Sequence, residues 1–266
     1  MENSVRKLAV RTEMHEANVW AACCDAAAKL PGNVLGALTD YTVSPPLVLV
    51  AAIDSWAINR VIGLGLCSPA TRQTISSVTD FYRSHGQHSF AIELSPAACP
   101  PDLAETLEGA GFRPRASTVT KMWGSTEDLP PTPTDVQVRR LGPEHRDAIA
   151  ELNAMAWGTW LAADLKSWFG ATVGTPPFRH YGVFDGDRLV SVGALAVTGA
   201  LGWLGFAATH PHYRGRGLRR RTECVRIADA RDLGCRIVHL EMATEYALPR
   251  QPFAKLYQRT LYTPCS

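Results

Sequence analysis

Residues 209–218 read Thr-His-Pro-His-Tyr-Arg-Gly-Arg-Gly-Leu, and this stretch decides the fold that we expect. An apolar run, 201–208, precedes it, and a segment with helical periodicity, 218–233, follows it. The order predicts a strand, a turn that contains two glycines, and a helix. The first backbone N–H groups of a helix have no carbonyl partner within it, and they attract anions. Five arginines surround the turn: Arg214, Arg216, Arg219, Arg220 and Arg221. A phosphate group is therefore the expected ligand.

Composition limits the class of protein. The chain has 266 residues, enough for one large domain or two of about 130. With 46% hydrophobic and 20% charged residues, a packed soluble core is expected. A net charge of +2 gives no reason to expect general nucleic-acid binding, and no apolar run is long enough to cross a membrane. The seven cysteines have no metal-binding spacing, so we expect reduced thiols, no metal site and a cytoplasmic protein.

A proline-rich stretch divides the chain. Residues 124–135 read Gly-Ser-Thr-Glu-Asp-Leu-Pro-Pro-Thr-Pro-Thr-Asp, and three prolines within four residues oppose both a helix and a central strand. We therefore expect an N-terminal domain over 1–125, a linker over 126–135 and a C-terminal domain over 136–266.

The two halves share one order of elements. The second half predicts strands at 136–141, 179–184, 188–197, 201–208 and 235–242, with helices at 143–156, 161–169 and 218–233. A last helix is expected to begin at Pro249 or Pro252 and to end near Arg259. The first half predicts strands at 56–66, 89–94 and 117–123, with helices at 69–85 and 101–108. Internal duplication of an α/β unit follows from this repetition.

The second half resembles the GNAT acyl-CoA N-acyltransferases, which carry Arg/Gln-x-x-Gly-x-Gly/Ala at a strand-to-helix turn. Arg214 and Gly217 match that motif, whereas Arg219 stands where the family has Gly or Ala. The resemblance implies an α/β (α+β) fold of two tandem GNAT-like domains, each with a mixed, mainly antiparallel twisted sheet flanked by helices. The first copy is degenerate, because residues 67–71 (Cys-Ser-Pro-Ala-Thr) at its turn contain neither glycine nor arginine.

The resemblance implies acetyl-CoA as the acyl donor. Backbone N–H groups at the turn would hold its pyrophosphate, and glycine permits close approach there. The end of the strand, which a bulge splays from its neighbour in this family, would contact the pantetheine arm. The implied binding residues are Phe206, Ala207, Ala208, Thr209, Arg214, Gly215, Arg216, Gly217, Leu218, Arg219, Gln251 and Ala254.

A second family feature lies near the C-terminus. Tyr257 falls on the tyrosine that acts as general acid in the family, while Gln251 replaces an Asn and Leu261-Tyr262 replaces Gly-Phe. Only four residues follow Tyr262, so the domain's final strand is expected to be missing or to come from elsewhere.

The general base is less defined, because the strand 201–208 has no carboxylate. Glu241, on the strand 235–242, is our choice for the base. The alternatives are Glu245, in the following loop, and His210 and His212, which flank the turn.

The expected activity is transfer of an acetyl group from acetyl-CoA to a primary amine of a small molecule by direct attack. One alternative is acetylation of a protein N-terminus or lysine. Another is a CoA-binding module without catalysis, which the departures at Arg219 and Leu261 favour. We expect a monomer or homodimer; the acceptor itself does not follow from the sequence.

Overall fold

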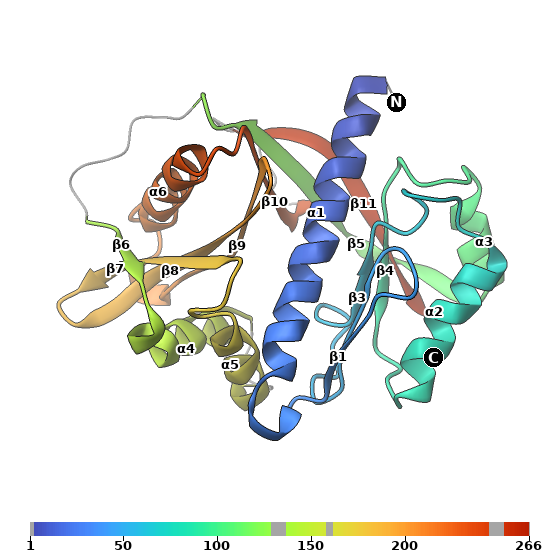
Figure 1. Cartoon of the computed structure of the whole chain (residues 1–266), viewed down its shortest axis with the longest axis horizontal. Helices are drawn as coiled ribbons and strands as arrows, with labels where there is room; N and C mark the ends of the chain where they lie inside the picture. Colours follow the sequence, from blue (N-terminus) through green and yellow to red (C-terminus); the bar gives the residue numbers. More distant parts are fainter. Residues whose placement is uncertain (1–2, 129–136, 158–161, 245–252, 266) are drawn as a thin grey trace. The chain divides into compact units, whose positions relative to one another are not determined.

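The fold comes from a computed structural model that describes residues 3–128, 137–157, 162–244 and 253–265. The chain forms two compact units, drawn with their elements in Figure 1. The described residues of unit 1 are 3–122, 241–244 and 255–265, and those of unit 2 are 123–128, 137–157, 162–240 and 253–254.

Unit 1 contains three helices and most of its strands from the first half of the chain. Its helices are α1 (Asn3–Ala28), α2 (Arg72–Ser84) and α3 (Leu103–Gly109), with a 3-10 turn at Pro31–Asn33. Its strands are β1 (Ala37–Asp40), β2 (Leu47–Val50), β3 (Arg60–Ile62), β4 (Ala91–Leu94), β5 (Phe112–Ser125, in this unit to Met122) and β11 (Ala254–Pro264, from Lys255). Strands β1 and β2 pair as an antiparallel hairpin, and the others follow the order β3-β4-β11-β5.

The start of α2 is capped by its own side chains. Thr71 Oγ1 accepts a hydrogen bond from Thr74 N at 3.2 Å, and Thr74 Oγ1 accepts one from Thr71 N at 3.1 Å. This capping box satisfies backbone donors that an external anion would otherwise bind. Ile75, Val78 and Tyr82 then recur at helical spacing on the buried face of α2.

Unit 2 has a sheet in the order β10-β9-β8-β7-β6. Its strands are β6 (Arg139–Leu141), β7 (Phe178–Asp185), β8 (Arg188–Thr198), β9 (Leu201–Thr209) and β10 (Ile237–Ala243, in this unit to Leu240). Its helices are α4 (Arg146–Trp157), α5 (Ala162–Ala171) and α6 (Leu218–Asp232), with 3-10 turns at Pro143–His145 and Pro211–Tyr213. Pairing is antiparallel from β6 to β9 and parallel between β9 and β10. Figure 1 shows α6 on one side of this sheet and α4 with α5 on the other, which confirms the expected fold class.

Most elements lie within a few residues of their predicted bounds. The predicted helix 218–233 is α6, and the predicted strands 188–197 and 201–208 are β8 and β9. Helix α1 and strands β1 and β2 had no counterpart in the prediction.

The predicted helix that ends near Arg259 is wrong, because this segment is strand β11. Tyr257, Arg259 and Leu261 are buried and alternate with more exposed neighbours, which is the period of a half-buried strand. Threonine and tyrosine in 257–263 also favour extended backbone. Strand β11 pairs antiparallel with β4 in unit 1, and only two of its residues, Thr263 and Pro264, follow Tyr262.

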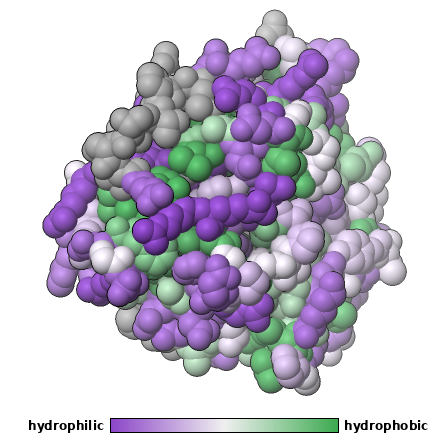
Figure 2. Space-filling view, turned by 60° about the vertical axis from the view of Figure 1, so that its left-hand side comes forward, coloured by the Kyte–Doolittle hydropathy of each residue, from purple (hydrophilic) through white to green (hydrophobic). Residues whose placement is uncertain are grey.

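Neither a membrane-spanning helix nor a metal-binding cluster occurs among the described residues. Over the described residues, no helix combines the length and apolarity that crossing a membrane requires. The same residues contain no group of three or more His, Cys, Asp or Glu side chains placed to hold a metal ion. Figure 2 shows the side of the molecule at the left of Figure 1, where strongly hydrophilic side chains lie beside hydrophobic surface.

Candidate active site

Residues 210–217, here called the phosphate loop, connect β9 to α6 in unit 2. Gly215 has φ 76° and Gly217 has φ 71°, a region of backbone conformation that strongly favours glycine. Gly217 is the N-cap of α6 and has no side chain to cap the helix, in contrast to Thr71 at the start of α2. A Cβ on Gly215 would meet no atom within 4 Å. The strand, glycine turn and helix expected from the sequence are therefore present.

Residues on both sides of the turn between β7 and β8 form hydrogen bonds to the phosphate loop. The Tyr213 hydroxyl donates to Asp185 Oδ2 at 2.5 Å, and Arg188 Nη2 donates to His210 Nε2 at 2.7 Å. The Arg216 guanidinium lies 4.9 Å from the centre of the Tyr213 ring. Desolvation and the neighbouring Arg188 lower the pKa of His210, so its ring nitrogen accepts the bond from Arg188 as a neutral imidazole. His210 thus has a structural partner.

Strand β9 bulges just before the loop. Val192 pairs with Ala208 and Ala194 with Gly205, so one residue of β8 faces two of β9, Phe206 and Ala207. Phe206 has φ 46° and is buried, while Ala207 is exposed. The register pairs of β9 with β10 in the described chain, from Leu201–Ile237 to Trp203–His239, all precede this bulge. The bulge that the family resemblance implied at 206–208 is therefore present.

A buried arginine that the sequence reasoning missed supports the bulge. Arg226, on α6, donates from Nη1 to Ala194 O at 2.9 Å and to Gly205 O at 3.4 Å. Its side chain occupies the space beside Gly193, where a Cβ would lie 2.6 Å from the guanidinium carbon. The available signal was an arginine on the buried face of a helix, together with glycines in both strands.

We predict that Gly193→Ala destabilises the protein by about 1–3 kcal/mol, because the added methyl group overpacks the space that Arg226 fills. Gly170→Ala, in α5, is the control, because its Cβ would meet neighbours at ordinary contact distances of 3.5 Å or more. Urea unfolding measures both changes. Equal unfolding midpoints for the two variants would show that the Arg226 side chain moves aside without lowering the unfolding free energy.

Unit 1 contains a cluster of seven charged side chains, here called the charge cluster, of which all but the half-buried Glu241 are buried: Glu13, Glu16, Arg60, Glu93, Lys121, Glu241 and Arg259. Arg259 Nη1 lies 3.3 Å from Glu13 Oε2, 3.2 Å from Glu16 Oε2 and 3.1 Å from Glu93 Oε2, and Arg259 Nη2 also pairs with Glu241. Arg60 pairs with Glu93 at 2.7 Å and with Glu241 at 2.8 Å, and Lys121 pairs with Glu16. Arg60 also stacks on Trp20, at 3.7 Å from the ring centre.

The charge cluster has one more acid than base. Four carboxylates against three cations leave one excess negative charge if every group is ionised. Burial makes that excess costly, so the cluster favours binding of a proton. Glu241 has the most exposed side chain of the seven, at 19%, and desolvation raises its pKa to about 7. Glu241 is therefore suited to exchange a proton near neutral pH.

Tyr257 joins the charge cluster through Glu13. Its ring is 6% exposed, and its hydroxyl donates to Glu13 Oε1 at 2.5 Å. Burial and the Glu13 carboxylate raise the pKa of the Tyr257 phenol well above its ordinary value, which weakens it as an acid. The structure thus brings Tyr257 and Glu241 into one network through Glu13 and Arg259.

The other expected site residues are distributed between the two units. Residues 206–209 and 214–219 lie in the bulge, the phosphate loop and the first turn of α6 in unit 2. Ala254, the exposed first residue of β11, belongs to the same unit. Gln251 and Glu245 lie outside the described residues. Six residues of the charge cluster were missed, because charged side chains are normally exposed and nothing in the local sequence marks these as buried: Glu13, Glu16, Arg60, Glu93, Lys121 and Arg259.

Two buried histidines give the protein a predicted pH dependence. His15 beside the charge cluster and His180 on β7 both have their pKa lowered to about 4, mainly by burial. Because the folded pKa lies below the unfolded value of 6.5, their stabilisation is complete above pH 6.5 and is lost as the pH falls toward 4. The unfolding free energy falls by about 3 kcal/mol per histidine once the imidazole is protonated in both the folded and the unfolded state.

Denaturant unfolding between pH 7 and pH 4 tests this expectation. His180→Gln should show a shallower fall of unfolding free energy than the wild type, because glutamine takes up no proton. NMR titration of the native protein gives the direct measurement. A midpoint near 6.5 for the His180 ring would contradict the prediction.

Comparisons with known proteins bear on the fold. A GCN5-related N-acetyltransferase from Kribbella flavida is 16% identical and superposes with a TM-score of 0.65, covering 92% of this chain and 96% of that one. A functionally unknown conserved protein from Staphylococcus epidermidis is 10% identical, with a TM-score of 0.60 and coverage of 90% and 98%. A tandem GNAT protein from the clavulanic acid biosynthesis pathway is 17% identical, with a TM-score of 0.50 and coverage of 72% and 68%.

Comparison at the level of sequence found no family model and no curated protein that matches. The structural likeness, together with the phosphate loop and the bulged strand, shows that the chain has the fold of the GCN5-related N-acetyltransferases.

Proposed function

We propose that this protein transfers an acetyl group from acetyl-CoA to a primary amine of a small molecule. The observation that carries the proposal is the contrast between the two helix starts that follow comparable strands. Thr71 and Thr74 cap α2 internally, whereas α6 begins at a left-handed glycine after a turn rich in arginine. A helix start of the second kind is suited to a phosphate group.

The residues around the phosphate loop fit acetyl-CoA. Gly215 leaves the backbone open to close approach, the Arg221 guanidinium lies beside Gly217, and Arg214 and Arg216 supply further positive charge for a diphosphate. The bulge at Phe206 and the small, exposed Ala207 suit the pantetheine arm, which needs strand backbone groups as partners. Bound acetyl-CoA would supply the activated acyl group.

The proposed reaction is direct attack. The amine nitrogen forms a bond to the thioester carbon, the carbon–sulfur bond breaks, and the CoA thiolate leaves with a proton. We assign the proton acceptor to Glu241, whose pKa near 7 suits it to take a proton from an ammonium group. Tyr257 is the candidate proton donor to sulfur, by its place in the family pattern. Its bond to Glu13 makes this the weaker of the two assignments.

A second candidate function is a CoA-binding module without catalysis. Arg219 stands where the family has a small residue, and the Tyr257 hydroxyl is already committed to Glu13. Binding and turnover therefore need separate tests. Acetylation of a protein N-terminus or lysine is the third outcome, and it differs from the leading proposal only in the acceptor.

The experiment has two stages. Calorimetry with acetyl-CoA first shows whether the protein binds the donor, and a thiol-release assay over a panel of small primary amines and amine-bearing peptides then measures turnover. Binding with release only for small amines supports the proposal. Binding without release points to the CoA-binding module, release only with peptides points to protein acetylation, and absence of binding refutes acyl transfer.

Glu241→Gln tests the base within that assay. We expect turnover to fall about 10²–10⁴-fold and its rise around pH 7 to disappear, with acetyl-CoA affinity unchanged. The charge cluster should tolerate the change, because glutamine removes the excess negative charge. Glu105→Gln, exposed on α3 in the same unit, is the control. If the pH profile of Glu241→Gln were unchanged, Glu241 would not be the base.

Tyr257→Phe tests the proton donor in the same assay. If this variant kept wild-type turnover at every pH, Tyr257 would not be the proton donor.

A further inference from the structure

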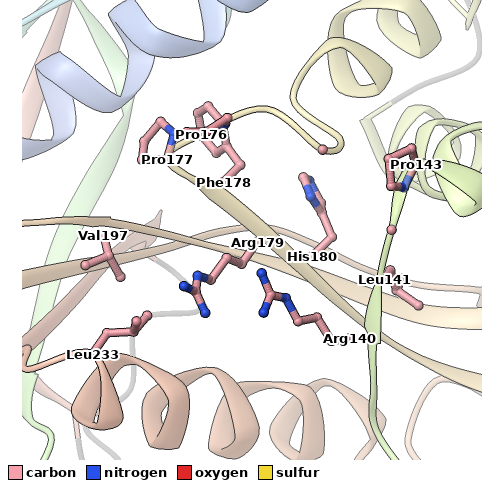
Figure 3. A pocket seen from close by; sticks show the side chains of 12 residues that line it. Arg140, Leu141, Pro143, Pro176, Pro177, Phe178, Arg179, His180, Val197 and Leu233 are labelled. Atoms are coloured by element: carbon pink, nitrogen blue, oxygen red, sulfur yellow. The ribbon is translucent and has the colours of Figure 1, made fainter.

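Unit 2 has a cavity that the proposed function does not use. It has a volume of about 730 Å³ and is lined by the end of β6, the start of β7, Val197 of β8 and Leu233, the residue after α6 (Figure 3). Its size falls within the range of small-molecule sites. It lies at the C-terminal end of α6, whereas the phosphate loop lies at the N-terminal end. A helix of 15 residues separates the two ends by about 22 Å.

Two arginines face this cavity from adjacent strands. Arg140 on β6 lies opposite Tyr181 on β7, and Arg179 is two residues from Tyr181, so both project from the same face of the sheet. Figure 3 shows both guanidinium groups in the space above the end of α6. His180 and Leu141 project from the opposite face, and His180 is neutral because burial lowers its pKa to about 4.

Of the two arginines at the cavity, one is paired and one is not. Arg179 Nη1 pairs with Asp229 Oδ2 at 3.1 Å, and the Tyr181 hydroxyl donates to the same carboxylate. Arg140 makes no ion pair with any described residue, and the lining residues include no Asp or Glu. Arg140 is therefore the arginine of this wall without an ion-pair partner among the described residues, and a further acid nearby is the exposed Glu144, whose carboxylate lies within 3 Å of where a Cβ on the lining residue Gly142 would be. The planar guanidinium of arginine binds carboxylate and phosphate oxygens through paired N–H donors.

The wall beside the arginines is apolar. Leu233 is 38% exposed, and it lines the cavity together with Val197 and Pro177. An anion with an attached hydrocarbon group would cover Leu233 while its oxygens reach Arg140. A bare inorganic anion would leave this apolar wall exposed.

We propose that this cavity is a second ligand site, for a small organic oxyanion: a carboxylate or phosphate monoester joined to an apolar group. Arg140 is its primary contact, Arg179 a second donor, and Leu233 the apolar contact. The carbonyl end of the α6 dipole opposes an anion, but this effect fades beyond the last helical turn, and both arginines come from the sheet.

Calorimetry with three probes tests the site: inorganic phosphate, phenyl phosphate and hexanoate. We expect phenyl phosphate or hexanoate to bind the wild type, and inorganic phosphate to bind at least tenfold more weakly. The stronger of the two organic probes identifies the headgroup. Arg140→Gln should weaken binding at least tenfold, and Leu233→Ser should remove the advantage of the organic probe over inorganic phosphate.

Arg139→Gln is the matched control, with the same charge change on the same strand. Its guanidinium lies over Phe184, 5.2 Å from the ring centre, and it does not line the cavity. Equal loss of affinity in Arg139→Gln and Arg140→Gln, or no binding of either organic probe, would overturn the proposal. Acetyl-CoA affinity should be the same in Arg140→Gln and wild type, so failure of this site and failure of the proposed function are distinguishable.

Discussion

Arg259→Met is expected to destabilise the protein by about 5 kcal/mol, at the upper end of the cost of breaking a buried ion pair. The reason is the number of partners that lose their counterion. Arg259 is fully buried and contacts four carboxylates: Glu13, Glu16, Glu93 and Glu241. Without it, only Arg60 and Lys121 remain to balance four acids. A loss of this size is a large share of the stability of a typical domain, about 5–15 kcal/mol.

The effect of Arg259→Met should depend on pH in a defined direction. Glu13 and Glu241 already have raised pKa values, that of Glu241 to about 7, and removal of Arg259 raises both further. A carboxyl with a raised folded pKa stabilises the protein below its unfolded pKa of 4.5, and this stabilisation is lost as the pH rises through the folded value. The variant should therefore lose more stability at pH 8 than at pH 5.

Chemical denaturation at the two pH values measures this difference. Lys255→Met, exposed near the start of the same strand, removes one positive charge without breaking the charge cluster and should change the unfolding free energy little. If Arg259→Met unfolded at the wild-type denaturant concentration, the ion pairs of the charge cluster would contribute little to stability. If its deficit were equal at pH 5 and pH 8, the carboxylates would not be the source of the effect.

The phosphate loop could be predicted from sequence because its signals are local. Apolar residues of β9, two glycines that must take positive φ, and the start of α6 lie within one short segment. Each signal depends on backbone conformation or periodicity that neighbouring residues define. The bulge at Phe206 was expected only through the family resemblance, although Gly205, inside the strand, is of a residue type that often marks a bulge.

The charge cluster could not be predicted in the same way. Glu13 and Glu16 lie on α1, and Arg259, which is 246 residues from Glu13, makes their burial possible. A glutamate in a helix is normally expected to be exposed to solvent. Only the position of a cation that lies far away in the sequence shows that these two glutamates are buried. Strand β11 was missed for the same reason. Arg259, a charged residue on its buried face, interrupts the alternation of apolar and polar residues that predicts a strand. The neighbour of β11, strand β4, comes from the other half of the chain.

Gly217→Glu is expected to weaken acetyl-CoA binding at least 100-fold, or about 2.7 kcal/mol. Gly217 has φ 71°, where a residue with a side chain pays about 1–2 kcal/mol in backbone strain. A Cβ there would also lie 2.9 Å from Arg221 Nη1, and the added carboxylate would repel a diphosphate at the helix start. The strain lowers the unfolding free energy, whereas the loss of affinity comes from the repulsion and from the side chain that occupies the helix start.

Gly234→Glu separates these contributions. Gly234 follows α6 at its other end with φ 85°, and a Cβ there would meet no atom within 4 Å. The substitution thus brings the same backbone strain and the same charge, about 22 Å from the phosphate loop. Calorimetry with acetyl-CoA should give near wild-type affinity for Gly234→Glu and a large loss for Gly217→Glu. Equal affinities in the two variants would place the nucleotide elsewhere, because a diphosphate held at the start of α6 cannot tolerate a carboxylate in its own site.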